Sequence, residues 1–319
     1  MTMDEREVKA PGRLRQVGPD HQSRRIDNYL FGELKDIPKS RIYQMLRRGE
    51  VRVNGGRIKP FYKLQPGDQV RIPPTRQTLA NEPAPAGDFL KQKVADSFIY
   101  EDDDLVVLNK PAGIVVHGGT GRSWGVIELL RALRADANAW QLVHRLDRET
   151  SGCLLIAKSM PVLRRLNAAM VAGDLEKEYL SLLKGRLPER RREVKAPLAS
   201  HRTGEGERMV AVDETGKTAQ TQFETLREFP QATLVRVRLL TGRTHQIRVH
   251  AAHLGHPVAG DDKYGDRDFN RQMRQFGLRR IFLHACQIDL PADMGLQCNR
   301  FAAPMPEGLQ SVIDRLEFC

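Results

Sequence analysis

Apolar residues recur at helical spacing in two short segments near the start of the chain. Ile26, Leu30 and Leu34 lie four residues apart, which places them on one face of a helix. A second helix is predicted from the N-cap Ser40 to Gly49, because serine commonly caps the start of a helix and glycine commonly follows its end. The pattern therefore predicts two consecutive short helices.

A small hairpin is predicted directly after these helices. Residues 51–53 and 70–72 alternate apolar and basic positions, as half-buried strands do. Asn54 and Gly55 are a strong signal for a tight turn, and Pro-Gly-Asp at residues 66–68 is a second turn signal. The helices and the hairpin together form one small unit.

Short strands dominate the rest of the chain, and helices interrupt them only occasionally. Strands in runs, without regular alternation with helices, favour an α+β sheet over a doubly wound parallel one. The predicted strands lie at residues 105–108, 114–116, 154–157, 179–183, 218–226, 233–240 and 281–290, and the predicted helices at residues 125–133 and 161–171.

The same patterns predict four segments. Residues 1–20 are polar and lack periodicity, which indicates a disordered arm. Residues 21–73 form a first domain and residues 89–319 a second one. Residues 74–88 between them are rich in Pro and Ala, which is typical of a linker.

Composition argues against a membrane protein and against a disulfide framework. No apolar run approaches the roughly 20 residues that a membrane-spanning helix needs. The N-terminus has no apolar core of a secretory signal, which favours a cytoplasmic location. The four cysteines form no CxxC pair and no histidine stands at zinc-finger spacing, so no structural zinc is predicted.

The chain has a formal net charge of +11, and much of it lies in the first domain. Residues 23–72 hold 12 basic and 5 acidic residues, a net charge of +7. Arginine predominates among the basic residues, and its planar guanidinium suits phosphates and base edges. A solvated basic surface is the alternative, but charge gathered on one small unit favours a nucleic-acid partner.

The run SRRIDNYLFGELKDIPKSRIYQMLRRGEVRVNGGRIKPFYKLQPGDQVRI at residues 23–72 resembles an S4 domain, a small α/β module that binds RNA. In that family the second helix and the loop around the first strand face RNA. A solvated helix face is the alternative interpretation. The resemblance implies phosphate contacts from Lys39, Arg41, Arg47, Arg48 and Arg52.

The densest polar cluster is HRLDRETSG, followed by an apolar strand. It places Asp147 on a loop between two core segments, a rigid setting that suits a catalytic carboxylate. A turn-capping aspartate paired with Arg145 or Arg148 fits the spacing equally well. His144 and Asp147 could bind a metal ion, but no further ligands complete the set.

A second cluster is TGRTHQIRVH. Thr244 is predicted to cap a helix on which His245 and Arg248 are three residues apart, so that Arg248 could point at a buried carboxylate. His245, His250 and His253 do not share one helical face, and no metal site is predicted from them.

Two shorter motifs are less specific. In the KEY motif Tyr179 begins a strand, and one tyrosine is normally part of a core. NKPAGIVVH at residues 109–117 is typical of a strand, a turn and a second strand.

In this order along the chain, NKPAGIVVH, HRLDRETSG, KEY and LLTGRTHQIRVH are similar to motifs of the RluA family of pseudouridine synthases. The segments GGTGRSWGVIELLRALR and DDKYGDRDFNRQMRQFGLRRIFLHA look most like the RluC type, which modifies 23S ribosomal RNA. The resemblance implies a pseudouridine synthase fold, an α+β fold with a mixed, mostly antiparallel central sheet, after the small N-terminal S4 domain. It also implies a monomer without a cofactor, whose partner is 23S ribosomal RNA or a large-subunit assembly intermediate.

The family chemistry isomerises uridine within RNA: the N-glycosidic bond breaks, the uracil rotates, and C5 bonds to C1′ of the ribose. The resemblance implies that Asp147 is the catalytic carboxylate, either as a nucleophile at C1′ or as the base that removes the 2′-proton. Arg248 would pair with Asp147 and hold it charged. Tyr179 would lie against the flipped base and could help to remove the C5 proton, directly or as part of the pocket. Arg145 would fill the gap that the base leaves in the RNA stack. The expected RNA contacts also include His144, Arg243 and His245.

Two other classes of function stay open. An RNA chaperone or ribosome-assembly factor would keep the basic domain but would not need Asp147, Tyr179 and Arg248 together. A nuclease would need a metal cluster or a histidine base beside a nucleophile, and a glycosidase usually needs two carboxylates.

Overall fold

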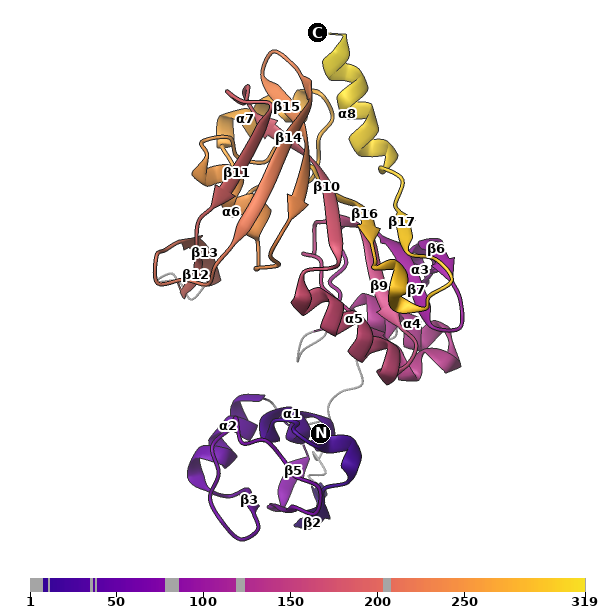
Figure 1. Cartoon of the computed structure of the whole chain (residues 1–319), viewed down its shortest axis with the longest axis vertical. Coiled ribbons are helices and arrows are strands. Elements are labelled where there is room, and N and C mark those ends of the chain that lie inside the picture. The colour runs from indigo at the N-terminus through magenta and orange to yellow at the C-terminus, as the bar shows by residue number, and fades with distance from the viewer. Residues whose placement is uncertain are drawn as a thin grey trace, which may run out of the picture. The chain divides into compact units, whose positions relative to one another are not determined.

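The computed structural model describes residues 8–10, 12–34, 37, 39–77, 86–118, 124–202 and 208–318. These residues divide into two compact units, one with the described residues up to Gln77 and one with those from Ala86 onward (Figure 1). None of the described helices is both long enough and apolar enough to cross a membrane.

The first unit packs two helices on a three-stranded sheet. The helices bury an apolar face that includes Ile26, Leu30, Ile42 and Met45 against Val70 of the sheet. The sheet has the order β2–β4–β3, and a separate pair joins β1 to β5. The bounds are β1 (Val8–Ala10), β2 (Arg13–Gln16), α1 (Ile26–Glu33), α2 (Lys39–Arg48), β3 (Arg52–Val53), β4 (Gln69–Ile72) and β5 (Thr75–Gln77).

Two local predictions are confirmed in this unit, and two segments predicted to lack structure contain strands, although residues 1–7 and 78–85 of those segments lie outside the described residues. Gly49 has a φ of +69° at the end of α2, and Asn54 and Gly55 turn the chain after β3 with φ of +49° and +78°. The predicted arm at residues 1–20 contains β2, which pairs with β4, and β1 of the arm pairs with β5 of the predicted linker at residues 74–88. These pairings join segments far apart in the sequence, so local periodicity does not reveal them.

The second unit is built on a ten-stranded sheet of order β11–β14–β15–β10–β16–β9–β7–β6, with β17 on β16 and β8 on β9 (Figure 1). All of its pairs are antiparallel except β9 with β16. A separate hairpin consists of β12 and β13. The mixed, mostly antiparallel sheet confirms the predicted α+β class.

The strands of this unit are β6 (Phe98–Glu101), β7 (Leu105–Lys110), β8 (Gln141–Leu142), β9 (Ser151–Ala157), β10 (Glu176–Lys184), β11 (Arg191–Lys195), β12 (Leu198–Arg202), β13 (Arg208–Val212), β14 (Gln220–Glu228), β15 (Ala232–Leu239), β16 (Leu283–Asp289) and β17 (Arg300–Ala302). The helices are α3 (Asp88–Ala95), α4 (Val126–Leu133), α5 (Met160–Ala172), α6 (Gln246–His253), α7 (Arg267–Gln275) and α8 (Glu307–Glu317).

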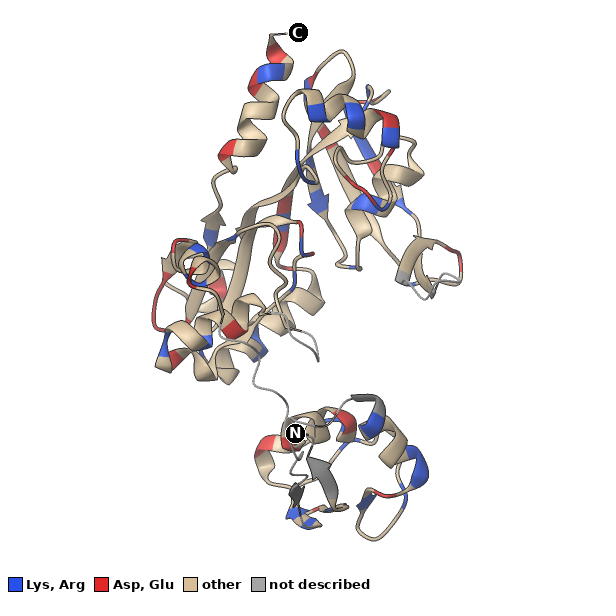
Figure 2. Cartoon of the chain, turned by 180° about the vertical axis from the view of Figure 1, so that it is seen from behind, with Lys and Arg blue, Asp and Glu red and all other residues tan. Residues whose placement is uncertain are grey.

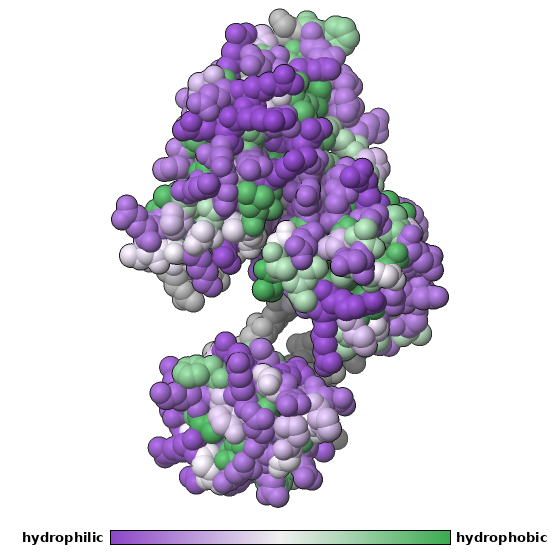
Figure 3. All heavy atoms as spheres, in the orientation of Figure 1, coloured by the Kyte–Doolittle hydropathy of each residue, from purple (hydrophilic) through white to green (hydrophobic). Residues whose placement is uncertain are grey.

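Both faces of β7 and β9 are buried, which explains why these strands are continuously apolar. Val106 and Leu154 face a core that includes residues of α4, whereas Val107 and Leu155 face a second core that includes Val162 of α5. Side chains alternate between the two faces of a strand, so successive residues enter different cores. Outside these cores, hydrophilic residues cover most of the face of each unit shown in Figure 3.

The predicted strand at residues 114–116 is wrong. Two of its backbone carbonyls accept hydrogen bonds from the first residues of α4 and not from a neighbouring strand. Val115 O accepts from Val126 N at 2.9 Å, and Val116 O accepts from Ile127 N at 3.3 Å. The first N–H groups of a helix have no partner within the helix, and this segment supplies them.

Gly152 permits the close approach of β9 and β16. It has a φ of +115°, and a Cβ atom there would lie 2.1 Å from the carbonyl oxygen of Ala285. We expect Gly152→Ala to lower the free energy of unfolding by about 3 kcal/mol, since it combines backbone strain with overpacking. Chemical denaturation followed by circular dichroism measures this loss.

The control is Gly173→Ala. Gly173 has a similar φ of +87° but nothing within 4 Å of the added Cβ. Its replacement should cost only the backbone strain, about 1 kcal/mol. Equal losses in the two variants would show that the close approach at Ala285 is unimportant.

Candidate active site

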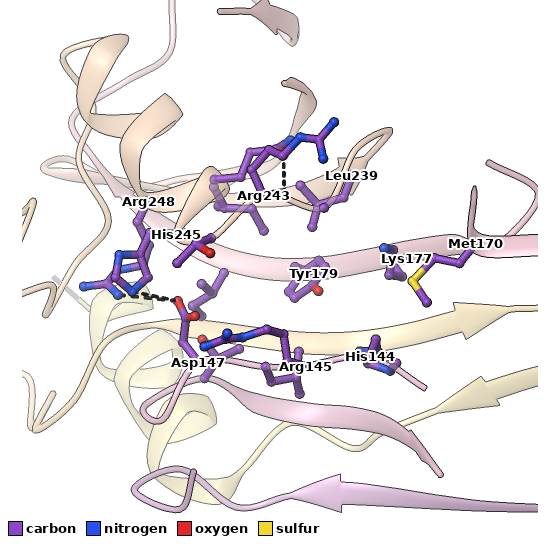
Figure 4. Close-up of a pocket in the computed structure, with 17 residues that line it drawn as sticks. His144, Arg145, Asp147, Met170, Lys177, Tyr179, Leu239, Arg243, His245 and Arg248 are labelled. Atoms are coloured by element: carbon purple, nitrogen blue, oxygen red, sulfur yellow. Dashed lines mark hydrogen bonds and ion pairs between the residues drawn. The ribbon is translucent and has the colours of Figure 1, made fainter. Parts of the chain in front are cut away.

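One pocket of about 210 Å³ in the second unit brings together the predicted site residues of that unit. Three segments carry its predicted residues: the loop that precedes β9, the strand β10, and the segment from the turn after β15 into α6 (Figure 4). Strand β10 pairs with β15 on one side and with β16 on the other, and β16 pairs with β9, so the sheet order brings the three segments together. The predicted residues that line the pocket are His144, Arg145, Asp147, Tyr179, Arg243, His245 and Arg248.

The NKPAG turn fastens the loop that carries Asp147. Lys110 is fully buried, and its Nζ donates to the carbonyls of Pro111 and Ile114 at 2.9 Å and to that of Arg148 at 3.1 Å. Gly113 N also donates to Arg148 O at 2.9 Å. Hydrogen bonds from Lys110 and Gly113 of NKPAGIVVH to the Arg148 carbonyl therefore link this motif to HRLDRETSG, which fixes the position of the loop.

Arg248 lies between two carboxylates that it binds unequally. Its Nε and Nη2 donate to the two oxygens of Asp261, both at 2.7 Å, whereas its Nη1 reaches Asp147 Oδ2 at 3.4 Å. The side chain of Asp261 is 0% exposed and that of Asp147 is 21% exposed. The predicted contact between Arg248 and Asp147 is present, but Asp261 is the bidentate partner that orients the guanidinium.

His245 forms a third contact with Asp147. Its Nε2 lies 3.8 Å from Asp147 Oδ2, and its Nδ1 lies 2.8 Å from the hydroxyl of Tyr264, which accepts from Val210 N at 3.1 Å. The imidazole therefore bridges the Tyr264 hydroxyl and the Asp147 carboxylate through its two nitrogens. Burial lowers the pKa of His245 despite the opposing Asp147 carboxylate.

Tyr264 also supports Arg248, since the guanidinium carbon lies 5.0 Å from the centre of its ring. His245 has a φ of +55°, a left-handed conformation that is uncommon outside glycine. It, and not the predicted Thr244, is the cap residue of α6, which begins at Gln246.

Other side chains of TGRTHQIRVH hold the turn and the start of α6 in place. Gln246 Oε1 accepts from Thr241 Oγ1 at 2.8 Å and from Arg243 N at 3.0 Å. The ring of His250 is fully buried between Thr221 Oγ1 and Ala196 O, each at 2.9 Å. The motif thus combines site residues with the bonds that hold its own turn.

The aromatic and imidazole groups in the middle of the pocket stay uncharged at neutral pH. Burial and the Asp147 carboxylate raise the pKa of Tyr179. Burial, with a contribution from Lys177, lowers the pKa of His144 to about 3, and His144 Nε2 accepts from Leu155 N at 3.1 Å. The RNA contact predicted for His144 stays a prediction.

The remaining predicted residues lie in two places. Arg145 is exposed beside Asp147 (Figure 4), and Arg243 is exposed and donates to Thr218 O at 3.0 Å. In the first unit, Arg47 and Arg48 are exposed at the end of α2. Figure 2 shows basic residues, coloured blue, on this unit.

Unlike Arg47 and Arg48, the predicted residues Arg41 and Arg52 form hydrogen bonds with other described residues of the first unit. Arg41 binds both carboxylate oxygens of Glu50 at 3.1 and 2.7 Å. Arg52 donates to Gly49 O and Gly55 O at 3.4 and 3.3 Å. The side chain of Lys39 lies outside the described residues.

Sequence reasoning missed Asp261, Tyr264 and Lys177. Lys177 lies in the KEY motif and lines the pocket, but its role was not considered. Asp261 and Tyr264 stand at the start of DDKYGDRDFNRQMRQFGLRRIFLHA, which resembles the RluC type, but neither periodicity nor spacing in that segment predicts a contact with Arg248. No group of three or more His, Cys, Asp or Glu that could hold a metal ion occurs within the described parts of the chain.

Comparison with known proteins identifies two matching families. Residues 104–253 match the family described as RNA pseudouridylate synthase, and residues 24–70 match the S4 domain. The chain is 46% identical over 315 residues to "Ribosomal large subunit pseudouridine synthase C" of Haemophilus influenzae, which covers 98% of both chains. It is 48% identical over 303 residues to the protein of that name in Escherichia coli K12, which covers 94% of this chain and 95% of the relative.

A solved structure shows the same architecture. "Human RNA Pseudouridylate Synthase Domain Containing 4" superposes with a TM-score of 0.60 and 25% identity, over 72% of this chain and 97% of the human one.

The buried pair of Asp261 and Arg248 gives a test of the site's electrostatics. Burial by itself raises the pKa of Asp261, but the hydrogen bonds and charge of Arg248 lower it overall. Its contribution to stability is therefore complete above the unfolded-state pKa of about 4 and is lost as the pH falls through the lower folded-state value. We expect Asp261→Asn to cost about 3 kcal/mol at pH 7 and to weaken the loss of stability in acid.

Urea denaturation between pH 7 and pH 3 measures both effects. Asp262→Asn is the control, because the Asp262 side chain is 88% exposed and its ion pair with Arg274, at 3.7 Å, is at the surface. It should cost less than about 1 kcal/mol. If Asp261→Asn cost no more than this control, Asp261 would not be the anchor of Arg248.

Proposed function

This chain belongs to the family of RNA pseudouridine synthases, and on that premise we propose that it isomerises uridines of large-subunit ribosomal RNA with Asp147 as the catalytic carboxylate. The relatives named for the large ribosomal subunit match over nearly the full length of both chains, which supports this RNA as the substrate. The reaction breaks the bond from C1′ to N1 and forms the bond from C1′ to C5. C5 loses a proton and N1 gains one, so the product is an isomer.

The arrangement around Asp147 is the observation that supports its role best. Arg248 and His245 both approach Oδ2, at 3.4 and 3.8 Å. Oδ1 has no partner among the described residues, and the side chain is partly exposed in the pocket. A carboxylate oriented through one oxygen and open at the other can add to C1′ or remove the 2′-proton.

Tyr179 forms a wall of this pocket on β10. Its raised pKa keeps the hydroxyl protonated, so a tyrosinate base at C5 is disfavoured. We assign the ring to contact with the uracil face, for which a flat aromatic surface suffices.

Base flipping is proposed from the position of Arg145. It is exposed at the mouth of the pocket, two residues before Asp147 on the same loop (Figure 4). A guanidinium can stack on the bases next to the vacated position, which offsets part of the cost of unstacking the uridine.

We expect Asp147→Asn to abolish turnover while RNA binding persists. Asparagine keeps the shape of the side chain but can act neither as a nucleophile nor as a base. Release of tritium from 23S ribosomal RNA transcribed with 5-tritiated uridine should fall by roughly a thousandfold or more. Each turnover expels the C5 hydrogen, so the assay covers either route.

Asp262→Asn is the matched control, because the Asp262 side chain is 88% exposed. It should release tritium at the wild-type rate. Comparable release by the two variants would refute the catalytic role of Asp147.

The exposed arginines at the end of α2 are proposed to bind RNA phosphates. We expect the double variant Arg47→Gln and Arg48→Gln to weaken binding to 23S fragments and to reduce the slope of log K against log salt by roughly 1.5. Filter binding between 50 and 200 mM salt measures this slope. Arg41→Gln should change it less, because Glu50 already pairs with Arg41; an unchanged slope in the double variant would contradict the proposal.

A further inference from the structure

Lys177 is a half-buried cation of the pocket that the reaction above does not use. It lies two residues before Tyr179 on β10, so both side chains extend from one face of the strand, and both line the pocket. Glu178 between them faces the other way and binds Arg236 and Arg238 at 3.3 and 2.7 Å.

Other buried or half-buried lysines of this unit have acceptors. Lys110 binds backbone carbonyls, Lys158 binds Glu101 at 2.6 Å, and Lys184 binds Asp266 at 2.5 Å. Lys177, by contrast, has neither a carboxylate within 4.0 Å nor a hydrogen-bond acceptor among the residues that the structure describes. Burial lowers the pKa of its ammonium, which reflects the cost of holding the charge there.

The position of Lys177 separates it from the reaction centre. In Figure 4 it lies with Met170 and His144 on one side of Tyr179, whereas Asp147, His245 and Arg248 lie on the other. Its ammonium is therefore not a second counter-charge for Asp147.

Gly242 lies beside the ammonium and has no side chain to cover it. A Cβ atom at Gly242 would lie 3.5 Å from Lys177 Nζ, and Gly242 itself is exposed. A ligand can approach the ammonium from this side without displacing a side chain.

We propose that Lys177 binds a backbone phosphate next to the uridine that enters the pocket, an inference that rests on the proposed function. An RNA strand carries a phosphate on each side of every ribose, so an anion accompanies any sugar held at Asp147. The ammonium of lysine is a compact point charge that suits a phosphate, whereas base edges are more often read by bidentate side chains. The phosphate supplies the acceptor that the protein lacks.

The test compares Lys177→Met with Lys158→Met, which removes a half-buried lysine that does have a partner. The salt dependence of binding to 23S ribosomal RNA fragments is measured in the Asp147→Asn background, so that no turnover is required. We expect Lys177→Met to bind about tenfold more weakly at low salt and to reduce the slope of log K against log salt by roughly 0.7. Lys158→Met should leave the slope unchanged.

The melting temperatures of the two variants and the salt slope of Lys177→Arg provide further tests. Lys177→Met should keep or raise the melting temperature, because it removes an unpaired charge, whereas Lys158→Met should lower it. Lys177→Arg should restore the salt slope. A wild-type salt slope in Lys177→Met overturns the proposal, even if the variant binds RNA more weakly through a lost contact with a uracil carbonyl. Absence of tritium release by the wild-type enzyme would refute the isomerase function and leave this binding test intact.

Discussion

The unequal sharing of one guanidinium between two carboxylates is the constraint on which the site depends. Asp261 accepts from Nε and Nη2 of Arg248 at 2.7 Å, which fixes the plane of the guanidinium and leaves Nη1 facing Asp147 at 3.4 Å. If Asp261 were absent, Arg248 could bind both oxygens of Asp147 and occupy the carboxylate that the reaction needs. The buried pair thus keeps the reactive carboxylate oriented but accessible.

Several features of the fold serve this arrangement. The Lys110 ammonium and the NKPAG backbone hold the loop of Asp147, and Tyr264 contacts both His245 and Arg248. The bond from Val210 to Tyr264 extends this support to the β12–β13 hairpin. Motifs that are distant in the sequence therefore act together to hold Asp147, His245 and Arg248 in position.

The sequence allowed prediction of those parts that depend on local pattern. The turn at Asn54 and Gly55, the helix stripes and most strands of the large sheet lie where the pattern indicates them, because side-chain periodicity and turn chemistry determine them. The motifs also named Asp147 and Arg248, which the structure places in contact.

The failures share one physical cause, which is that the partner lies elsewhere in the chain. Residues 114–116 have the composition of a strand, yet their carbonyls meet the start of α4. The pairing of β1 with β5 and the partnership of Arg248 with Asp261 likewise depend on tertiary contacts that no local pattern encodes. Lys177 was overlooked for a different reason: its significance is the absence of a partner among the described residues, which only coordinates can show.

The place of β16 in the sheet has a consequence for the order of folding. This strand follows every other strand of the sheet except β17, yet it lies in the middle, between β9 and β10. Ser151 on β9 meets His284 across 133 residues of sequence, and Leu283 of β16 lines the pocket itself. Contacts of such long range form slowly, and during synthesis they must wait until the later segment has emerged. A nascent chain that ends before β16 therefore carries all three motif segments of the pocket without the strand that joins them, and the enzyme gains its active site only late in its own synthesis.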